Sequence, residues 1–284
     1  VSNLKFHVLQ ILSRCTKLNE YITKIGAPME DILVDRRGEV LWITLNRPER
    51  LNSYGRQTVD EIIMTLRENM DARVGVITGS GRAFCAGGYL GNLAEADFWN
   101  VRSMFVGSLE LFDALRNAPF PIIAAVNGGA FGGGNELVVM CDLAIAAESA
   151  QLGQTGVKVG SAPVLGGTNL LAMNIGEKRA KEVSFLCRKY SAQEAYDLGW
   201  VNKVVPDDKL HDEVEIWCQE IIQMSARYLE VAKASSNVMY HQMRDNMVNS
   251  LGALIQAIGS PDMLEGANAF MEKRKPEFPP RGTR

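Results

Sequence analysis

The sequence lacks any uninterrupted apolar run of the roughly 18–20 residues that a membrane-spanning helix needs. It also lacks an excess of basic residues: 30 lysines and arginines stand against 33 acidic residues, so the net charge is −3. We therefore expect neither a membrane protein nor a nucleic-acid-binding protein. The N-terminus does not have the pattern of a secretory signal, because its apolar stretch, 8–12, is short and is followed by Arg14 and Lys17.

Cysteine and histidine are scarce and scattered. The five cysteines are odd in number and have no C-x-x-C spacing, and the three histidines have no metal-ligand spacing with one another. This pattern favours reduced thiols in a cytoplasmic compartment over a disulfide framework. It also predicts that the protein has no metal site.

The order of apolar segments predicts the fold class. Strand-like segments alternate with helix-like segments as far as residue 205, and helical segments alone follow, which is typical of an α/β core with a helical tail. We expect three regions: a partly helical N-terminal extension (1–29), an α/β core (30–206) and a helical C-terminal segment (207–284). The strands are expected at 31–34, 40–45, 73–78, 122–126, 143–147 and 201–205.

The most distinctive stretch is 130–137, in which three glycines precede Asn135 and Glu136. It lies between the predicted strand 122–126 and a helix predicted to begin at residue 136. Glycine lets a ligand approach the main chain, and the first N–H groups of a helix have no internal partner. Such a turn can hold an oxygen that gains negative charge, with Glu136 beside it. The alternative is a glycine hinge with Glu136 in solvent.

Four strings together resemble the crotonase (enoyl-CoA hydratase/isomerase) superfamily, from about Ile32 to the C-terminus. They are LNRPERLNS (45–53), GRAFCAGGYL (81–90), PIIAAVNGGAFGGGNELVVMCDLAIAAESAQLGQTG (121–156) and EKRKPEF (272–278). The resemblance implies a spiral core of repeated ββα units and a C-terminal helical segment that drives trimerisation, with trimers pairing into hexamers. It also implies acyl-CoA thioesters as substrates and no separate cofactor.

The resemblance assigns roles to particular residues. The backbone N–H groups of Gly88 and Gly133 would form the oxyanion hole for the thioester carbonyl, and Glu136 would be the acid/base. Enoyl-CoA hydratases have a second glutamate, and its position here is Gly156. Half of the hydratase pair is therefore absent, and proton delivery to the α-carbon needs another source.

Further positions are implied to bind the CoA ester. Ala83 and Ala86 fall where main-chain groups recognise the adenine of CoA. Phe270 and Lys273 fall where the C-terminal helix of a neighbouring subunit touches CoA. Tyr89 is expected to be a wall of the acyl pocket, with a hydrogen-bond donor as the alternative.

Three strings resemble the subgroup of dihydroxynaphthoyl-CoA synthase and 2-ketocyclohexanecarboxyl-CoA hydrolase, which make or open rings. They are LGQTGVKVGS (152–161), FLCRKYSAQEAYDLGWVNKVVP (185–206) and EKRKPEF (272–278). Gln154, Thr155 and Gly156 match the loop that can hold a bicarbonate in the naphthoate synthases. However, the tryptophan that completes that pocket is Ser184 here, and the subgroup's aspartate is Pro163. The resemblance thus implies the subgroup's loops without its full chemistry.

We expect an acyl-CoA lyase or hydratase that uses Glu136 and the Gly88/Gly133 oxyanion hole, with a cyclic or bulky acyl group favoured by the ring-handling subgroup. Three alternatives stay open. They are a ring-opening C–C hydrolase of a 2-ketocycloalkyl-CoA, an enoyl-CoA isomerase and a non-catalytic CoA-binding protein. The partners would be the acyl-CoA substrate and further copies of the chain.

Overall fold

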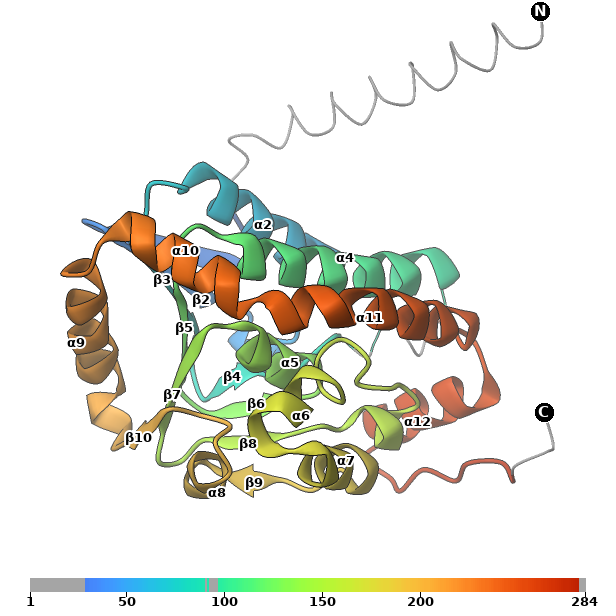
Figure 1. The fold of residues 1–284 in the computed structure, drawn as a ribbon. Helices are drawn as coiled ribbons and strands as arrows, with labels where there is room; N and C mark the ends of the chain where they lie inside the picture. The colour runs from blue at the N-terminus through green and yellow to red at the C-terminus, as the bar shows by residue number, and fades with distance from the viewer. Residues whose placement is uncertain (1–28, 90, 92–96, 281–284) are drawn as a thin grey trace, which may run out of the picture. The chain divides into compact units, whose positions relative to one another are not determined.

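The computed structural model describes residues 29–280, except for residue 90 and residues 92–96 (Figure 1). The extension predicted for residues 1–29 therefore lies almost wholly outside the described residues. Within the described part of the chain, no helix is both long and apolar enough to cross a membrane.

The larger sheet has six strands in the order β1-β2-β3-β5-β7-β10. β1 and β2 form an antiparallel hairpin, and every other neighbouring pair in this sheet is parallel. Every residue of β3 and β5 is buried, which explains why the sequence shows continuous apolar runs there rather than alternation. The strands are β1 (Ile32–Arg37), β2 (Val40–Leu45), β3 (Val74–Gly79), β5 (Ile122–Val126), β7 (Leu143–Ala147) and β10 (Lys203–Val205).

A second, four-stranded sheet has the order β4-β6-β8-β9. β4, β6 and β8 each follow a strand of the larger sheet, so successive turns of the chain add one strand to each sheet. This is the ββα spiral that the resemblance implied. None of these short strands was predicted, because segments of two or three residues show no periodicity. They are β4 (Ala83–Cys85), β6 (Gly129–Phe131), β8 (Gln151–Gly153) and β9 (Tyr190–Ser191).

Helices complete the core. α9 packs on the larger sheet, where its Leu210, Val214 and Cys218 join one buried cluster with strand residues such as Val76 and Ile145. The helices that lie between β2 and β10 along the chain are α2 (Arg56–Glu68), α4 (Phe98–Asn117), α5 (Gly133–Met140), α6 (Leu170–Ile175), α7 (Glu177–Leu186) and α8 (Ala192–Asp197). Short 3-10 helices are η1 (Pro48–Arg50), η2 (Gly156–Val159) and η3 (Asp207–Lys209).

α2 is capped by Gly55, after Leu51 and Asn52 adopt left-handed conformations (φ 55° and 56°). One helix start differs from the prediction. α5 was expected from residue 136 and begins at Gly133. α8 begins with a capping box, in which the Ser191 side chain accepts from Glu194 N and the Glu194 carboxylate accepts from Ser191 N.

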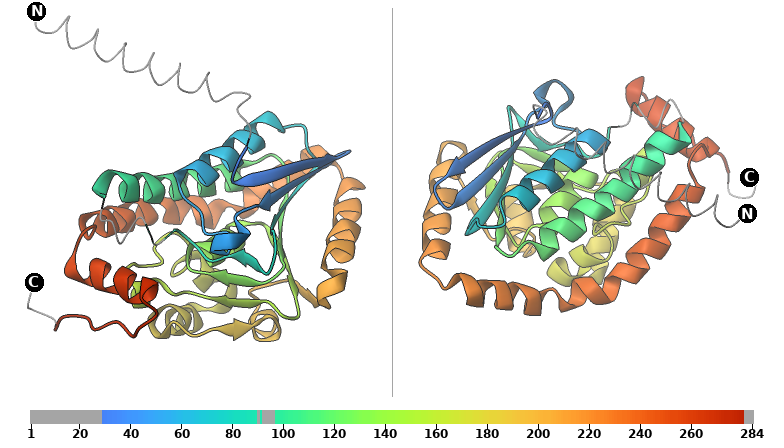
Figure 2. Two further views of the ribbon diagram at one scale, coloured as in Figure 1. Left: turned by 180° about the vertical axis from the view of Figure 1, so that it is seen from behind. Right: turned by 90° about the horizontal axis from the view of Figure 1, so that it is seen from above.

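After residue 206 the chain is helical, as predicted, and these helices run around the outside of the core (Figure 2, orange to red). They are α9 (Leu210–Ile222), α10 (Ala226–Ser236), α11 (Val238–Gln256) and α12 (Pro261–Met271). Lys233 of α10 is buried and donates to the carbonyls of Leu115 (2.9 Å) and Phe120 (2.8 Å). It also pairs with Asp142 at 2.8 Å, so one side chain joins the helical segment to the core.

Candidate active site

The glycines at the start of α5 are required for different reasons. Gly132 has a φ of 55°, which side chains rarely adopt. A Cβ added to Gly133 would clash with the Tyr54 hydroxyl, and one added to Gly134 would clash with the Cys85 carbonyl. The backbone at this helix start is therefore in close contact with the chain on two sides.

Gly88 and Gly133 each have a backbone N–H that is available to a ligand. Tyr54 and Gly88 pair in a short parallel β-bridge, in which Tyr54 N donates to Gly87 O (2.9 Å) and Tyr89 N donates to Tyr54 O (2.9 Å). The N–H of Gly88 therefore points away from Tyr54. Gly133 opens α5, where an N–H has no carbonyl one turn earlier. Neither N–H donates to another of the residues that the structure describes.

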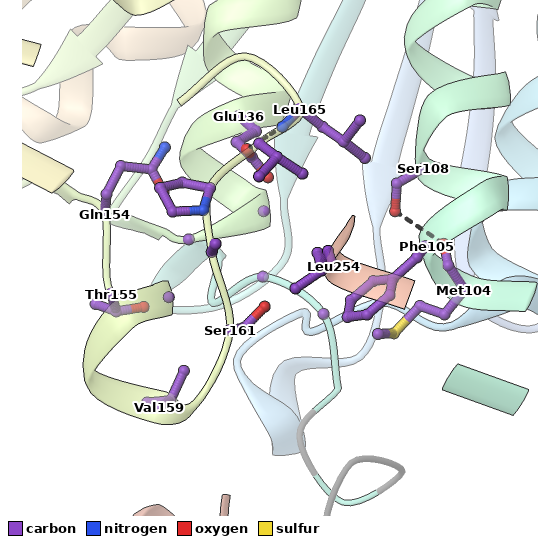
Figure 3. Close-up of a pocket in the computed structure, with 18 of the residues that line it drawn as sticks. Met104, Phe105, Ser108, Glu136, Gln154, Thr155, Val159, Ser161, Leu165 and Leu254 are labelled. Carbon is purple, nitrogen blue, oxygen red and sulfur yellow. Dashed lines mark hydrogen bonds between the residues drawn. The ribbon is translucent and has the colours of Figure 1, made fainter. Parts of the chain in front are cut away.

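The two glycine loops, 86–88 and 132–134, lie against one another and border one cavity. A Cβ on Gly87 would be 3.0 Å from Gly133 N, which shows how close the loops are. The cavity has a volume of about 80 Å³ open to water. Its apolar lining includes Ala86, Met104, Phe105, Val159, Pro163, Leu165 and Leu254, and its polar lining includes Tyr54, Ser108, Glu136, Gln154, Thr155 and Ser161 (Figure 3).

Glu136 is the carboxylate of this cavity. Its side chain is held by loop backbone, because Oε1 accepts from Leu165 N at 3.0 Å and from Gly167 N at 3.3 Å (Figure 3 draws the first of these). The residue is 8% exposed. Burial raises the pKa of Glu136 from 4.5 to about 7, although the two N–H groups act in the other direction. The carboxyl can therefore exchange a proton near neutral pH.

The loop that holds Glu136 is itself supported. Ser184 donates to the carbonyl of Gly167 at 3.1 Å, so the residue at the position of the subgroup's tryptophan fixes the backbone beside Glu136. Gln154 is fully buried, and neither polar atom of its amide has a partner among the described residues. The amide packs against Gly167, so this loop brings a neutral polar group near Glu136.

Gly156, where a hydratase has its second glutamate, borders the same cavity. A Cβ there would be 3.3 Å from the backbone of Ala162, so a side chain at this position needs the neighbouring loop to move slightly. The cavity thus contains one carboxylate, Glu136, among the lining residues that the structure describes.

The other residues predicted to bind the CoA ester lie in different places. Ala86 lines the cavity, whereas Ala83 is buried in β4 and its carbonyl accepts from Asn52 Nδ2 at 2.7 Å. Tyr89 is not among the lining residues, and its ring lies under the guanidinium of Arg50, 5.2 Å from the ring centre. The main-chain recognition of adenine and the pocket-wall role of Tyr89 stay predictions.

The C-terminal residues predicted to touch CoA lie outside the cavity of their own chain. Phe270 is 57% exposed, and Lys273 follows α12 with a left-handed φ of 56°. α12 packs on η2, the 3-10 helix that borders the cavity, because Gly160 and Gly266 meet there. A role in a neighbouring subunit stays a prediction.

Several lining residues were not identified from the sequence. Tyr54 lies next to a matched string, and Met104, Ser108 and Leu254 lie on helices, but nothing in their spacing separates a cavity wall from a packed core. Phe105 is one of the buried residues of α4, and it also borders the cavity. Among the described residues, no three His, Cys, Asp or Glu side chains are grouped so that they could hold a metal ion.

Two backbone amides without a partner beside one buried carboxyl group, on an α/β spiral, are an arrangement that can stabilise an oxyanion. The family model for enoyl-CoA hydratase/isomerase matches residues 35–281. The chain belongs to the enoyl-CoA hydratase/isomerase family, whose members act on CoA thioesters.

Solved structures agree with this assignment. An enoyl-CoA hydratase from Bacillus anthracis is 34% identical, with 88% of this chain and 99% of that one covered and a TM-score of 0.72. An enoyl-CoA hydratase/isomerase from Mycobacterium paratuberculosis is 30% identical, with 86% and 99% covered and a TM-score of 0.79. An enoyl-CoA hydratase from Mycobacterium avium subsp. paratuberculosis K-10 is 26% identical, with 89% and 100% covered and a TM-score of 0.81.

Proposed function

We propose that the protein is an acyl-CoA lyase that adds water to an enoyl-CoA, with Glu136 as its base. The observation that carries this proposal is the position of Glu136: a buried carboxyl, with a pKa raised by burial to about 7, borders the same cavity as Gly88 and Gly133. A base with a pKa near neutrality can both accept and release a proton during turnover.

In the proposed reaction, the thioester oxygen accepts hydrogen bonds from the amides of Gly88 and Gly133. Ionised Glu136 removes a proton from a water molecule as the water oxygen attacks the β-carbon, and the electron pair of the double bond moves towards the thioester oxygen. The resulting enolate is stabilised by the two amides, each worth about 3–4 kcal/mol in comparable sites. A proton from solvent water then adds to the α-carbon, which completes the 3-hydroxyacyl-CoA, and Glu136 returns its own proton to solvent.

The cavity volume bears on the acyl group. About 80 Å³ suits a short acyl chain together with one water molecule. The cyclic or bulky group expected from the ring-handling subgroup would need more of this space, next to Met104 and Phe105. A substrate panel should therefore include both classes, crotonyl-CoA for the short chain and cyclohexenecarbonyl-CoA for the ring.

The experiment is turnover of this panel in ¹⁸O-labelled water, read by mass spectrometry, for the wild type and Glu136→Gln. We expect one labelled water to be added by the wild type. The variant should lose roughly 100-fold or more in kcat, because a general base contributes about 10²–10⁴-fold. Equal rates for the two proteins would remove Glu136 from the mechanism.

A second candidate is an enoyl-CoA isomerase, favoured by Gly156 in place of a second carboxylate. One carboxyl group beside an oxyanion hole is sufficient to move a proton from the γ-carbon to the α-carbon without water. In the same experiment an isomerase shifts the double bond and incorporates no label. A ring-opening hydrolase instead adds one water to 2-ketocyclohexanecarboxyl-CoA with loss of the ring.

We also propose the assembly and location that this function implies. The exposed Phe270 and Lys273 would complete the CoA site of a neighbouring subunit in a trimer or hexamer, and the C-terminal helices would form the contact. CoA would enter only as part of the substrate, so no separate cofactor is needed. Cys85, Cys141, Cys187 and Cys218 are free thiols, which is consistent with a cytoplasmic protein.

A further inference from the structure

Tyr54 connects the two glycine loops of the proposed oxyanion hole. Its backbone N and O bond the residues on either side of Gly88, each at 2.9 Å. Its hydroxyl lies against Gly133, in the space that a Cβ on that glycine would occupy. One side chain therefore extends from the first amide donor to the second, and its hydroxyl borders the cavity.

The Tyr54 hydroxyl is neutral and has its proton available for donation. Burial, followed by the charge of Glu136, raises the pKa of Tyr54 far above its ordinary value of 10. Ser108 bonds the carbonyl of Met104 at 2.9 Å, which uses its single proton. The weaker contact of 3.4 Å between Ser108 Oγ and Tyr54 Oη therefore has Tyr54 as the donor.

A long contact to Ser108 is easily exchanged for a stronger acceptor. A thioester oxygen held by Gly133 N would lie beside the Tyr54 hydroxyl, and it gains negative charge during the reaction. Hydrogen bonds from a neutral donor to a charged oxygen are shorter and about twice as strong as bonds between neutral groups. The hydroxyl is thus placed to donate more strongly to the enolate than to the ground-state ester, which is the condition for catalysis.

We propose that Tyr54 is a third donor of the oxyanion hole, its hydroxyl bonding the thioester oxygen as the enolate forms. This inference rests on the proposed function, because it needs an acyl-CoA in the cavity. The Tyr54 hydroxyl would be an uncharged hydrogen-bond donor in a site where Gly156 stands at the position of the hydratases' second glutamate. It also predicts that the site favours substrates whose reaction places full charge on the thioester oxygen.

The test uses Tyr54→Phe, which keeps the ring between Gly88 and Gly133 and removes only the hydroxyl. Tyr240→Phe is the matched control, because Tyr240 is also buried and donates to Asp113 at 2.7 Å, outside the cavity. The probe is acetoacetyl-CoA, whose enolate absorbs in the near ultraviolet. Titrating the bound ligand with pH gives the pKa at which the enolate forms on each protein.

We expect Tyr54→Phe to raise the apparent pKa of bound acetoacetyl-CoA by about one to two units, since one oxyanion donor is lost. kcat on the best substrate of the panel should fall roughly 10- to 100-fold, with KM little changed, and Tyr240→Phe should match the wild type in both measurements. Tyr54→Leu should be impaired further, because it also removes the ring that packs against Gly133.

The outcomes are distinguishable. If Tyr54→Phe has the wild-type ligand pKa and kcat, or if Tyr240→Phe shows the same change, the hydroxyl is not a third donor and the inference is overturned. In that case the proposed function stands as long as the wild type binds and enolises acetoacetyl-CoA. If the wild type binds no acyl-CoA, the proposed function itself fails, and this inference fails with it.

Discussion

At the scale of the residue, Glu136 has two opposing influences on its charge. Removal from water disfavours the carboxylate, whereas the N–H groups of Leu165 and Gly167 favour it, and burial is the larger influence. The second oxygen of the carboxyl group is not used by these two bonds. The structure therefore holds the side chain by one oxygen and leaves the other for a substrate or water.

This environment makes folding stability depend on pH. The pKa of Glu136 is about 7 in the folded protein and 4.5 in the unfolded chain, so its contribution to stability is complete below pH 4.5 and is lost as the pH rises through 7. Glu136→Gln has no such loss. We expect the free energy of unfolding of the variant, relative to wild type, to increase by about 3 kcal/mol between pH 4.5 and pH 8.

Urea unfolding of both proteins at pH 5, 6, 7 and 8 measures this difference. If this difference stays constant over the series, the carboxyl titrates normally, and the proposed base loses its physical basis.

The pKa of Glu136 also governs activity. A base must be ionised, so kcat of the wild type should rise through about pH 7. A rate that falls over that range instead assigns Glu136 the role of an acid.

At the scale of the element, the first turn of α5 is constrained by its contacts. Gly133→Ala puts a methyl group against the Tyr54 hydroxyl, so either the ring or the helix start must move. We expect kcat to fall roughly 100-fold, as small displacements of catalytic groups often do. In a Tyr54→Phe background the added loss should be smaller, because the nearest remaining atom, Tyr54 Cζ, is 3.0 Å from that Cβ.

Steady-state kinetics of the four proteins in this double-mutant cycle provides the measurement. Gly252→Ala is the control, because a Cβ there has no atom within 4 Å. Its kcat should equal that of the wild type. If the effects of Gly133→Ala and Tyr54→Phe are independent, the contact between them does not position the amide of Gly133.

The strands also show which parts of the fold can be predicted from the sequence. Strands β2, β5 and β7 were predicted with their exact ends, because doubly buried strands are continuous apolar runs bounded by turn residues. β4, β6 and β8 were missed because a strand of three residues is too short to show a periodicity. The pairing that brings β4 beside β6 is what places Gly88 near Gly133.

The residues of the site also divide into those that the sequence marks and those that it does not. Glu136 and its glycines were found because an unusual local composition marks them. Tyr54 and Ser108 were not found, because a side chain that lines a cavity has the same spacing as one packed in a core. Gln154 and Gly156 were found only through resemblance, and their placement beside Glu136 depends on the fold of the loop 154–167.

At the scale of the whole molecule, the C-terminal helices depend on a buried charge. Lys233 is 7% exposed, and its ammonium group is surrounded by Asp142 and by the carbonyls of Leu115 and Phe120. Burial lowers the pKa of Lys233, and the charge of Asp142 acts against this. Each partner is acceptable inside the protein only because the other is present.

Lys233→Met should therefore destabilise the protein strongly. It leaves the Asp142 carboxylate without its cation and two carbonyls without a donor, and we expect a loss of about 3–5 kcal/mol in urea unfolding. Adding Asp142→Asn should recover part of this loss, because the charge is removed while an oxygen remains to accept from Ile122 N (2.8 Å). The control is Lys203→Met, which breaks a partly exposed pair with Glu213 and should change stability by about 1 kcal/mol or less.

The double variant decides between two explanations of how α10 is held to the core. If the charge pair is the main attachment, Lys233→Met is much less stable than the double variant, and both keep a single unfolding transition. If the surrounding apolar contacts are sufficient, all three variants unfold near the wild-type midpoint. Because α10 leads through α11 to Leu254 in the cavity wall, loss of this attachment should also weaken binding of acetoacetyl-CoA.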